Sequence, residues 1–366
     1  MKFNCSAESL LKEASYALDF AAQKNFVSVL SHFYIEVSGN ILKIQATNQK
    51  MAFTTTIAVH SQEDGSCLVP AEKLMNSLKA IDPATELIIS DDGDRLLITN
   101  ESQKIKFFLK IDSTEKLPIE TEFDETESIE ISQKLFLDML NQVYSSISTE
   151  ETKYAMNGAN FEGEDDLIMV GTNGKKLSMY KVKNDGPSFK AVTIPISFLN
   201  IIRKMGTGEG NFRIRFSANG NLVIFNFATY EIYSVLISQA FPNYRVVIPK
   251  DLPYTCRIKT ADMNEALKRI SVFIDPSLKR VLFRMTEDSI EVYSDETDQG
   301  KANEIIDCEV QGEPMEFSLT LSHVQPILKT LDSEYFVIHY ENNRKQLIIT
   351  TDPKSDYFHL LMPLNL

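Results

Sequence analysis

A chain of 366 residues is too long to fold around one hydrophobic core, so two or three domains are expected. Hydrophobic residues make up 43% of the chain and charged residues 24%, which is typical of a soluble globular protein, and no apolar run has the roughly 18 residues of a membrane-spanning helix. The net charge of −14 argues against a protein coated with basic surface for nucleic acid, although it does not say where the 37 basic residues lie.

The N-terminal residues and the cysteines favour a cytoplasmic protein. Residues 1–6 run directly into a strand-like pattern without the apolar core of a signal peptide. Cys5, Cys67, Cys256 and Cys308 are isolated in the sequence, and no pair has the spacing of a zinc site. We therefore expect reduced thiols, no metal site and no cofactor.

Apolar periodicity predicts six amphipathic helices. They cover residues 7–19, 71–81, 133–147, 196–205, 261–273 and 323–331. The fourth is the clearest, because Phe198, Ile201, Ile202 and Met205 recur at helical spacing and should face a sheet. Alternating apolar runs between the helices, broken by turn clusters such as residues 38–40 and 91–94, predict two hairpins in each copy of a repeated unit.

The helices recur with one period. The second, fourth and sixth follow short β-like runs, and from Pro70 to Pro195 is 125 residues and from Pro195 to Leu321 is 126. The other three follow Ser6, Ser132 and Thr260, which are 126 and 128 residues apart and are suitable N-caps. Because both sets of helices recur with the same period, the sequence predicts three copies of one unit. Because the strands run in hairpins, the predicted class is α+β with antiparallel sheets.

Two polar, proline-containing stretches are the predicted joints between the copies. The first runs from Asp112 to Glu127 and is rich in acidic residues, and the second covers residues 249–253. They predict three domains, residues 1–125, 126–252 and 253–366.

The predicted helices are more basic than the rest of the chain. Together they carry a net charge of +2, so the remaining residues carry −16. Ordinary solvated helix faces would explain this small difference. Alternatively, a ring that gathers such helices, with Arg203 and Lys204 among their charges, would suit loose, sequence-independent contact with phosphates.

Local motifs for chemistry are weak. Residues 206–210 contain three glycines, but they follow a helix and precede a strand, so a turn is favoured over a phosphate loop. Residues 91–94 lack the spacing of an EF-hand and are read as a hairpin turn. The C-terminal segment from Tyr357 is apolar, which predicts a last strand within a sheet, a wall of a pocket for a partner peptide, or both.

Several motifs resemble those of the bacterial DNA polymerase sliding clamps, the β subunits of the replicative polymerase. They are residues 241–249 (FPNYRVVIP), 157–158 with 161–162 (NG, FE), 172–177 (TNGKKL) and the ending 362–366 (MPLNL). The similarity covers the whole chain, including the threefold repeat. It implies a DNA-clamp fold in which each repeat has two inner helices and outer antiparallel sheets, and a head-to-tail homodimer whose six repeats form a ring around duplex DNA.

The resemblance also implies a function and a set of site residues. The family is not enzymatic; it tethers the replicative polymerase for processivity and binds the clamp loader and other proteins through a hydrophobic peptide. The implied peptide pocket comprises Thr172, Gly174, Lys176, Leu177, Pro242, Val247, Leu360, Met362, Pro363 and Leu364. The DNA-facing positions are Lys24, Lys73, Lys79, Lys153 and Tyr154, together with Arg203 and Lys204 of the basic helix. The dimer interface maps onto Phe107 and Phe108 on one side and Val272 and Phe273 on the other.

The chain departs from the common family pattern within the pocket. Asn173, Lys175 and Lys176 replace Asp, His and Arg of the usual motif, and Asn365 replaces an Arg. Lysine lacks the planar fork of arginine, so the peptide preference of the pocket should be shifted. Two other classes of protein remain as alternatives: an enzyme with a carboxylate-lined cleft between repeats, and a protein-only scaffold that does not bind DNA.

Overall fold

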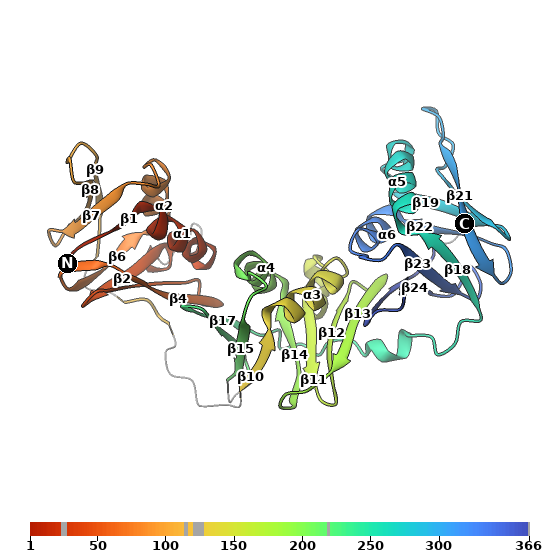
Figure 1. Ribbon diagram of the computed structural model, residues 1–366, viewed down its shortest axis with the longest axis horizontal. Helices are drawn as coiled ribbons and strands as arrows, with labels where there is room; N and C mark the ends of the chain where they lie inside the picture. Colours follow the sequence, from red (N-terminus) through yellow and green to blue (C-terminus); the bar gives the residue numbers. More distant parts are fainter. Residues whose placement is uncertain (23–27, 113–115, 120–127, 218–219, 365–366) are drawn as a thin grey trace. The chain divides into compact units, whose positions relative to one another are not determined.

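The computed structural model describes residues 1–22, 28–112, 116–119, 128–217 and 220–364 (Figure 1). The chain forms two compact units. Unit 1 comprises Met1–Lys134 with Asn200–Leu236, and unit 2 comprises Leu135–Leu199 with Ile237–Leu366. The division passes through the third and fourth α-helices, so the central part of the chain contributes to both units.

One order of elements occurs three times: a strand, a helix, a set of strands, a second helix and three further strands. The first copy consists of β1 (Lys2–Ser6), α1 (Ala7–Ala17), η1 (Leu18–Phe20), η2 (Ser28–Ser31), β2 (His32–Ser38), β3 (Ile41–Thr47), β4 (Met51–Ala58), β5 (His60–Glu63), β6 (Gly65–Pro70), α2 (Ala71–Lys79), β7 (Glu86–Asp91), β8 (Arg95–Asn100) and β9 (Lys106–Lys110). The second copy consists of β10 (Ser128–Ser132), α3 (Gln133–Tyr144), η3 (Glu151–Met156), β11 (Gly158–Gly163), β12 (Asp166–Thr172), β13 (Lys176–Lys183), β14 (Phe189–Pro195), α4 (Ile196–Met205), β15 (Asn211–Phe216), β16 (Leu222–Phe227) and β17 (Tyr230–Val235).

The third copy follows the short helix η4 (Tyr244–Val247). It consists of β18 (Tyr254–Lys259), α5 (Thr260–Ile270), η5 (Ser271–Phe273), β19 (Arg280–Met285), β20 (Ser289–Tyr293), β21 (Asn303–Gln311), β22 (Met315–Thr320), α6 (Leu321–Leu328), β23 (Tyr335–Tyr340), β24 (Leu347–Asp352) and β25 (Tyr357–Leu361). The repeat expected from the sequence is therefore present in the order of elements. The expected boundary near residue 125 lies outside the described residues.

The helix starts agree with the sequence expectation at some positions and differ at others. The backbone N–H of Ser9 donates to the Ser6 hydroxyl, as expected of an N-cap. The expectation for Thr260 is wrong: α5 begins at Thr260 itself, Lys259 occupies the cap position, and the buried Thr260 hydroxyl has no partner in the described part of the chain. The sixth helix begins at Leu321, two residues earlier than predicted.

The strands form antiparallel sheets within each unit. Every strand pair of the described residues is antiparallel, as predicted. Unit 1 holds a five-stranded sheet of order β5-β1-β7-β8-β9 and an eight-stranded sheet of order β10-β15-β16-β17-β4-β3-β2-β6. Unit 2 holds a twelve-stranded sheet of order β14-β11-β12-β13-β25-β24-β23-β18-β21-β20-β19-β22.

Two strand pairs join neighbouring copies of the repeat. In unit 1, β17 of the second copy pairs with β4 of the first. In unit 2, β13 of the second copy pairs with β25 of the third, from Lys176 opposite Leu361 to Tyr180 opposite Tyr357. The sheets therefore continue from one repeat into the next through backbone hydrogen bonds.

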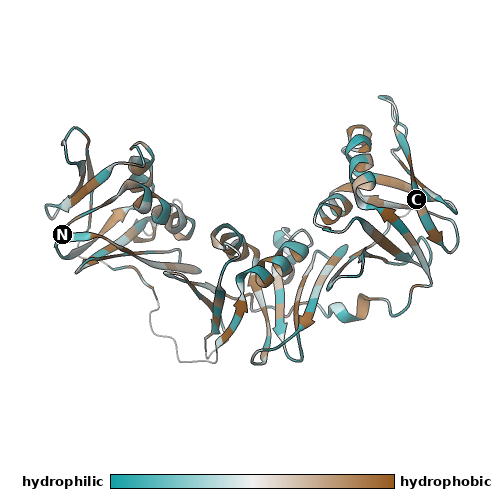
Figure 2. Cartoon of the chain, viewed as in Figure 1, coloured by the Kyte–Doolittle hydropathy of each residue, from teal (hydrophilic) through white to brown (hydrophobic). Residues whose placement is uncertain are grey.

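The helices bury one apolar face, as their periodicity predicts. Phe198, Ile201, Ile202 and Met205 of α4 are all buried, whereas its two basic residues are exposed. Brown and teal residues alternate along helices and strands in Figure 2, as expected of elements with one buried face. Within the described residues, no helix is long and apolar enough to cross a membrane.

Candidate functional site

A pocket of about 270 Å³ lies where β13 meets β25 in unit 2. Buried Leu177 and Leu360, from neighbouring strands, form its apolar floor. Val247 and Met362 line it with exposed fractions of 42% and 38%, so they leave apolar surface open to solvent. Partly exposed apolar side chains around a concave floor suit an apolar peptide side chain. We call this cavity the docking pocket.

A tight turn at residues 172–176 forms one wall of the docking pocket. Gly174 has φ +84°, a left-handed conformation that favours glycine. The Asn173 side-chain oxygen accepts hydrogen bonds from the backbone N–H groups of Lys175 (2.9 Å) and Lys176 (3.0 Å). An aspartate would accept the same two bonds, so Asn173 preserves the turn without adding a negative charge.

Lys176 is the unusual residue of the docking pocket. Its side chain is only 4% exposed, and it forms no salt bridge with another residue of the described chain. Burial lowers the pKa of Lys176 to about 8, because its charged form loses hydration. On α6, burial and then the nearby charges of Lys176, Lys175 and Lys153 together lower the pKa of His323 to about 4. The pocket region is therefore cationic, and its histidine is neutral at pH 7.

A buried polar chain fixes the junction of β13 and β25. The Ser178 hydroxyl lies 2.7 Å from Nδ1 of His359 and 2.7 Å from the Ser146 hydroxyl. Burial, with a smaller contribution from Lys176, lowers the pKa of His359 to about 3, so this imidazole stays neutral over the physiological range. These bonds hold the two strands that carry the pocket floor.

Tyr244 anchors a second wall of the docking pocket, which comes from the segment before β18. Its ring packs in a cluster with Val170, Leu177 and Leu360. Its hydroxyl donates to Glu162, which also pairs with Arg245. Burial and this hydrogen bond raise the pKa of Tyr244, so the hydroxyl remains a donor. The exposed Val247, three residues later, is thereby held at the pocket rim.

The structure brings together most of the residues expected in the pocket. Eight line it: Thr172, Gly174, Lys176, Leu177, Pro242, Val247, Leu360 and Met362. Leu364 does not line it; its backbone pairs with Ser318, and Pro363 lies between Met362 and that bridge. The sequence expectation omitted five lining residues, which are Met156, Lys175, Asn243, Tyr244 and Gln346. Four of these lie close in sequence to expected positions, whereas Gln346 gives no local signal.

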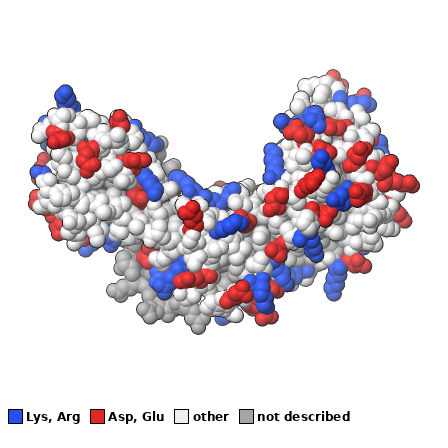
Figure 3. Space-filling view, in the orientation of Figure 1, with Lys and Arg blue, Asp and Glu red and all other residues white. Residues whose placement is uncertain are grey.

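The expected DNA-facing residues have different surroundings. Lys73 and Lys79 lie exposed on α2, and Tyr154 is 49% exposed on η3. Lys204 forms a salt bridge of 2.7 Å with Asp19, and Lys153 forms one of 2.9 Å with Glu150. Lys24 lies outside the described residues. Basic and acidic side chains are interspersed on the surface seen in Figure 3.

Three of the four residues expected at the dimer interface are exposed apolar groups, and the fourth, Phe107, is partly buried. Phe108 is 56% exposed on β9, which is the edge strand of the five-stranded sheet that also carries Phe107. Val272 and Phe273, on η5, are 77% and 39% exposed. An unpaired edge strand and exposed apolar side chains are features that protein association covers.

Three copies of one unit, antiparallel sheets that continue across repeats, and an apolar pocket at one junction define a three-domain DNA clamp. The chain matches three domains of the DNA polymerase III beta subunit: the N-terminal domain over residues 1–119, the central domain over 130–243 and the C-terminal domain over 245–365. This protein therefore belongs to the DNA polymerase III beta subunit family, the bacterial β sliding clamps.

Individual relatives are similar over the whole chain. The beta sliding clamp of Treponema pallidum is 29% identical, with 100% of this chain and 99% of the relative covered. The crystal structure of the C. crescentus beta sliding clamp superposes with a TM-score of 0.94 at 20% identity, covering 100% of this chain and 99% of that one. A sliding clamp from Pseudomonas aeruginosa, solved bound to griselimycin, superposes with a TM-score of 0.93 at 19% identity and full coverage of both chains.

Proposed function

We propose that this protein forms a head-to-tail homodimer that encircles duplex DNA and tethers the replicative polymerase. The observation that carries the proposal is the meeting of eight residues expected from the family resemblance in one apolar pocket, in a chain that matches all three domains of the family. On this proposal the protein is a non-enzymatic cytoplasmic processivity factor. Its domains are residues 1–125, 126–252 and 253–366.

The docking pocket is proposed to bind a short hydrophobic peptide of the polymerase, the clamp loader and other partners. Leu177, Val247, Leu360 and Met362 would contact the apolar side chains of the peptide, because these residues supply the floor and the open rim. The lining contains no Asp or Glu, which supports binding over carboxylate catalysis.

The ring is proposed to close through the exposed phenylalanines of β9 and η5, and to be lined by the basic residues of the helices. Lys73 and Lys79 are exposed and would contact phosphates without base specificity. The ion-paired Lys153 and Lys204 would contribute less, because each already has a carboxylate partner.

Topological retention on DNA tests this proposal. The protein is loaded onto a closed circular plasmid by a bacterial clamp loader and separated from free protein by gel filtration. We expect it to remain with the closed circle and to be released when a restriction enzyme cuts the circle. A monomer at micromolar concentration, or retention that is unaffected by cutting, would contradict encirclement.

Peptide docking is tested separately with griselimycin, the ligand bound to the Pseudomonas aeruginosa clamp. We expect griselimycin to bind this protein and to protect the pocket segments 172–177 and 357–362 from hydrogen exchange. Protection elsewhere, with none at these segments, would place peptide docking outside the pocket.

A further inference from the structure

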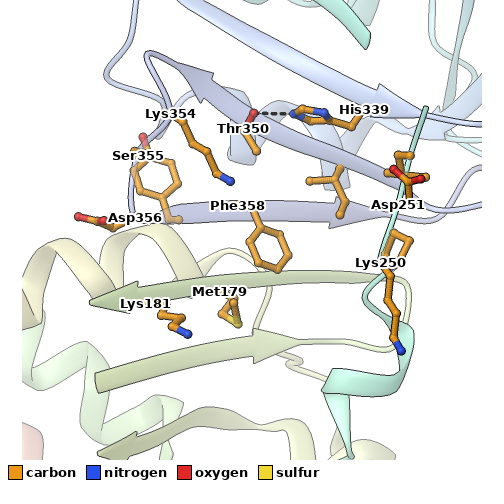
Figure 4. Close-up of a pocket in the computed structure, with 14 residues that line it drawn as sticks. Met179, Lys181, Lys250, Asp251, His339, Thr350, Lys354, Ser355, Asp356 and Phe358 are labelled. Atoms are coloured by element: carbon orange, nitrogen blue, oxygen red, sulfur yellow. Dashed lines mark hydrogen bonds between the residues drawn. The ribbon is translucent and has the colours of Figure 1, made fainter. Parts of the chain in front are cut away.

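A second and larger cavity, of about 560 Å³, adjoins the docking pocket on the same sheet (Figure 4). Its floor includes Met179, Phe358 and Ile348, and residues 249–252 of the segment between the second and third repeats form a wall. We call it the linker cavity. The motifs in the sequence do not point to it.

The two cavities are lined by alternate residues of the same two strands. On β13, Leu177 lines the docking pocket and Met179 and Lys181 line the linker cavity. On β25, Leu360 lines the docking pocket and Phe358 lines the linker cavity. Alternate residues of a strand lie on one face of a sheet, so both cavities open on the same face. The segment between the second and third repeats borders both cavities, because Val247 lines the docking pocket and Pro249 lines the linker cavity.

The lining of the linker cavity carries charges of both signs. Lys250, Lys354, Asp251 and Asp356 line it, and none of the four forms a salt bridge with another described residue, whereas Lys181 pairs with Asp166 at 2.6 Å. In Figure 4 the Lys354 side chain extends toward the middle of the cavity above Phe358, whereas Lys250 and Asp356 point away from it and Asp251 lies at the wall. Lys354 therefore lies over an apolar floor in a protein whose net charge is −14.

His339 does not add to this charge. Its Nε2 lies 2.9 Å from the Thr350 hydroxyl. Burial, and then the charge of Lys354, lower the pKa of His339, so the ring is neutral at pH 7. Lys354 is therefore the cation at the centre of the cavity, and a carboxylate bound beside it would raise the pKa of His339.

We propose that the linker cavity binds the residues that flank a docked hydrophobic peptide and selects flanking segments that carry a carboxylate. This inference rests on the proposed peptide docking. The apolar floor of Met179, Ile348 and Phe358 favours a peptide over a nucleic-acid backbone, because it offers contacts to aliphatic side-chain stems next to Lys354.

The length of the two cavities along β13 limits the position of that carboxylate. From Leu177 to Lys181 is four residues, or about 14 Å along an extended strand. An extended peptide covers this length in about four residues. The two cavities together therefore span about four residues of an extended peptide, and the carboxylate is expected within that span.

The test uses fluorescence anisotropy with synthetic peptides. A short hydrophobic peptide is first selected from a display library by its griselimycin-competed binding to the wild-type protein. It is then extended by four residues, Gly-Gly-Glu-Glu or Gly-Gly-Gly-Gly, at either end. The variants are Lys250→Ala, Lys354→Ala and the double variant. Lys183→Ala is the matched control, since Lys183 is exposed on the same strand but does not line the cavity.

We expect the acidic extension, at one end of the peptide, to raise affinity about tenfold over the neutral one at low salt. The double variant should lose this gain and keep the affinity for the short peptide, and Lys183→Ala should keep both. Equal binding of the acidic and neutral extensions at both ends would overturn this inference but not the proposed peptide docking. Displacement of the acidic extension by a short DNA duplex would also overturn it, by assigning the lysines to nucleic acid. Failure of every short peptide to bind would refute the proposed docking as well.

His339 gives a second readout that a purely structural role of Lys354 would not produce. Its ring resonances report its pKa in NMR titrations with and without peptide. We expect the acidic extension to raise this pKa and the neutral one to leave it unchanged. The same titration with the double variant should show no difference between the two peptides.

Discussion

Replacing Lys176 with methionine should stabilise unit 2. The pKa of this buried lysine is about 8 in the folded protein and 10.5 for an unperturbed lysine. At about 1.4 kcal/mol for each pH unit, the difference corresponds to about 3 kcal/mol. Methionine keeps the apolar stem and removes the buried charge. We therefore expect Lys176→Met to raise the free energy of unfolding by about 3 kcal/mol at pH 7.

The pH dependence separates this effect from a gain in apolar packing. Below pH 8 the lysine is charged in both the folded and the unfolded states, so the full cost of burying the charge is present. Between pH 8 and 10.5 the folded state loses the proton first, so the stability of the wild-type protein rises with pH. The advantage of Lys176→Met should therefore be largest below pH 8 and close to zero at pH 10.5.

Native-state hydrogen exchange in increasing urea measures this stability locally, through amides of β13 and β25. The exposed Lys175, one residue earlier, is the matched control, and Lys175→Met should change little. The reasoning is refuted if Lys176→Met is no more stable than wild type at pH 7. It is also refuted if the gain is the same at pH 7 and at pH 10.5. A natural lysine kept at this cost in stability is typical of a functional site.

Three further predictions concern other parts of the chain. Met362→Ala should weaken peptide or griselimycin binding roughly tenfold in a titration, whereas Val246→Ala, at a position 75% exposed and outside the pocket lining, should not. Phe108→Asp should convert the dimer into a monomer in sedimentation, and Ile41→Asp, at a similarly exposed position, should leave it intact. Burial raises the pKa of Glu13 despite a hydrogen bond from Tyr230, so Glu13→Gln should stabilise unit 1 in urea unfolding at pH 7. The gain should disappear as the pH falls below 4, where both the folded and the unfolded states hold the proton.

The repeat and most of the helices could be predicted because their signals are local. Apolar spacing fixes α4, and a hydroxyl before the first turn fixes the start of α1. The same reasoning fails at Thr260, because a threonine hydroxyl suits both a cap and a first helical residue, and the preceding strand determines which one forms. The cap signal alone cannot locate the end of β18.

The docking pocket and the linker cavity show where sequence reasoning ends. Family motifs identified Leu177 and Met362, but no local pattern pairs β13 with a strand about 180 residues later. Gln346 and the linker cavity cannot be predicted for the same reason: alternation shows which side chains share a face of a sheet, and not which segment crosses that face. Lys176 likewise gives no hint of its burial, because lysines are usually exposed.

The pairing of β13 with β25 also orders events during synthesis of this protein. The ribosome makes β13 and β24 before β25, which then inserts between them in the finished sheet. Until it does, both strands have an open edge, a known route to aggregation. A nascent or prematurely terminated chain that stops before Tyr357 has neither Leu360 nor Met362 and so has no complete docking pocket. Replication partners would thus engage only a clamp whose translation has reached its final strand.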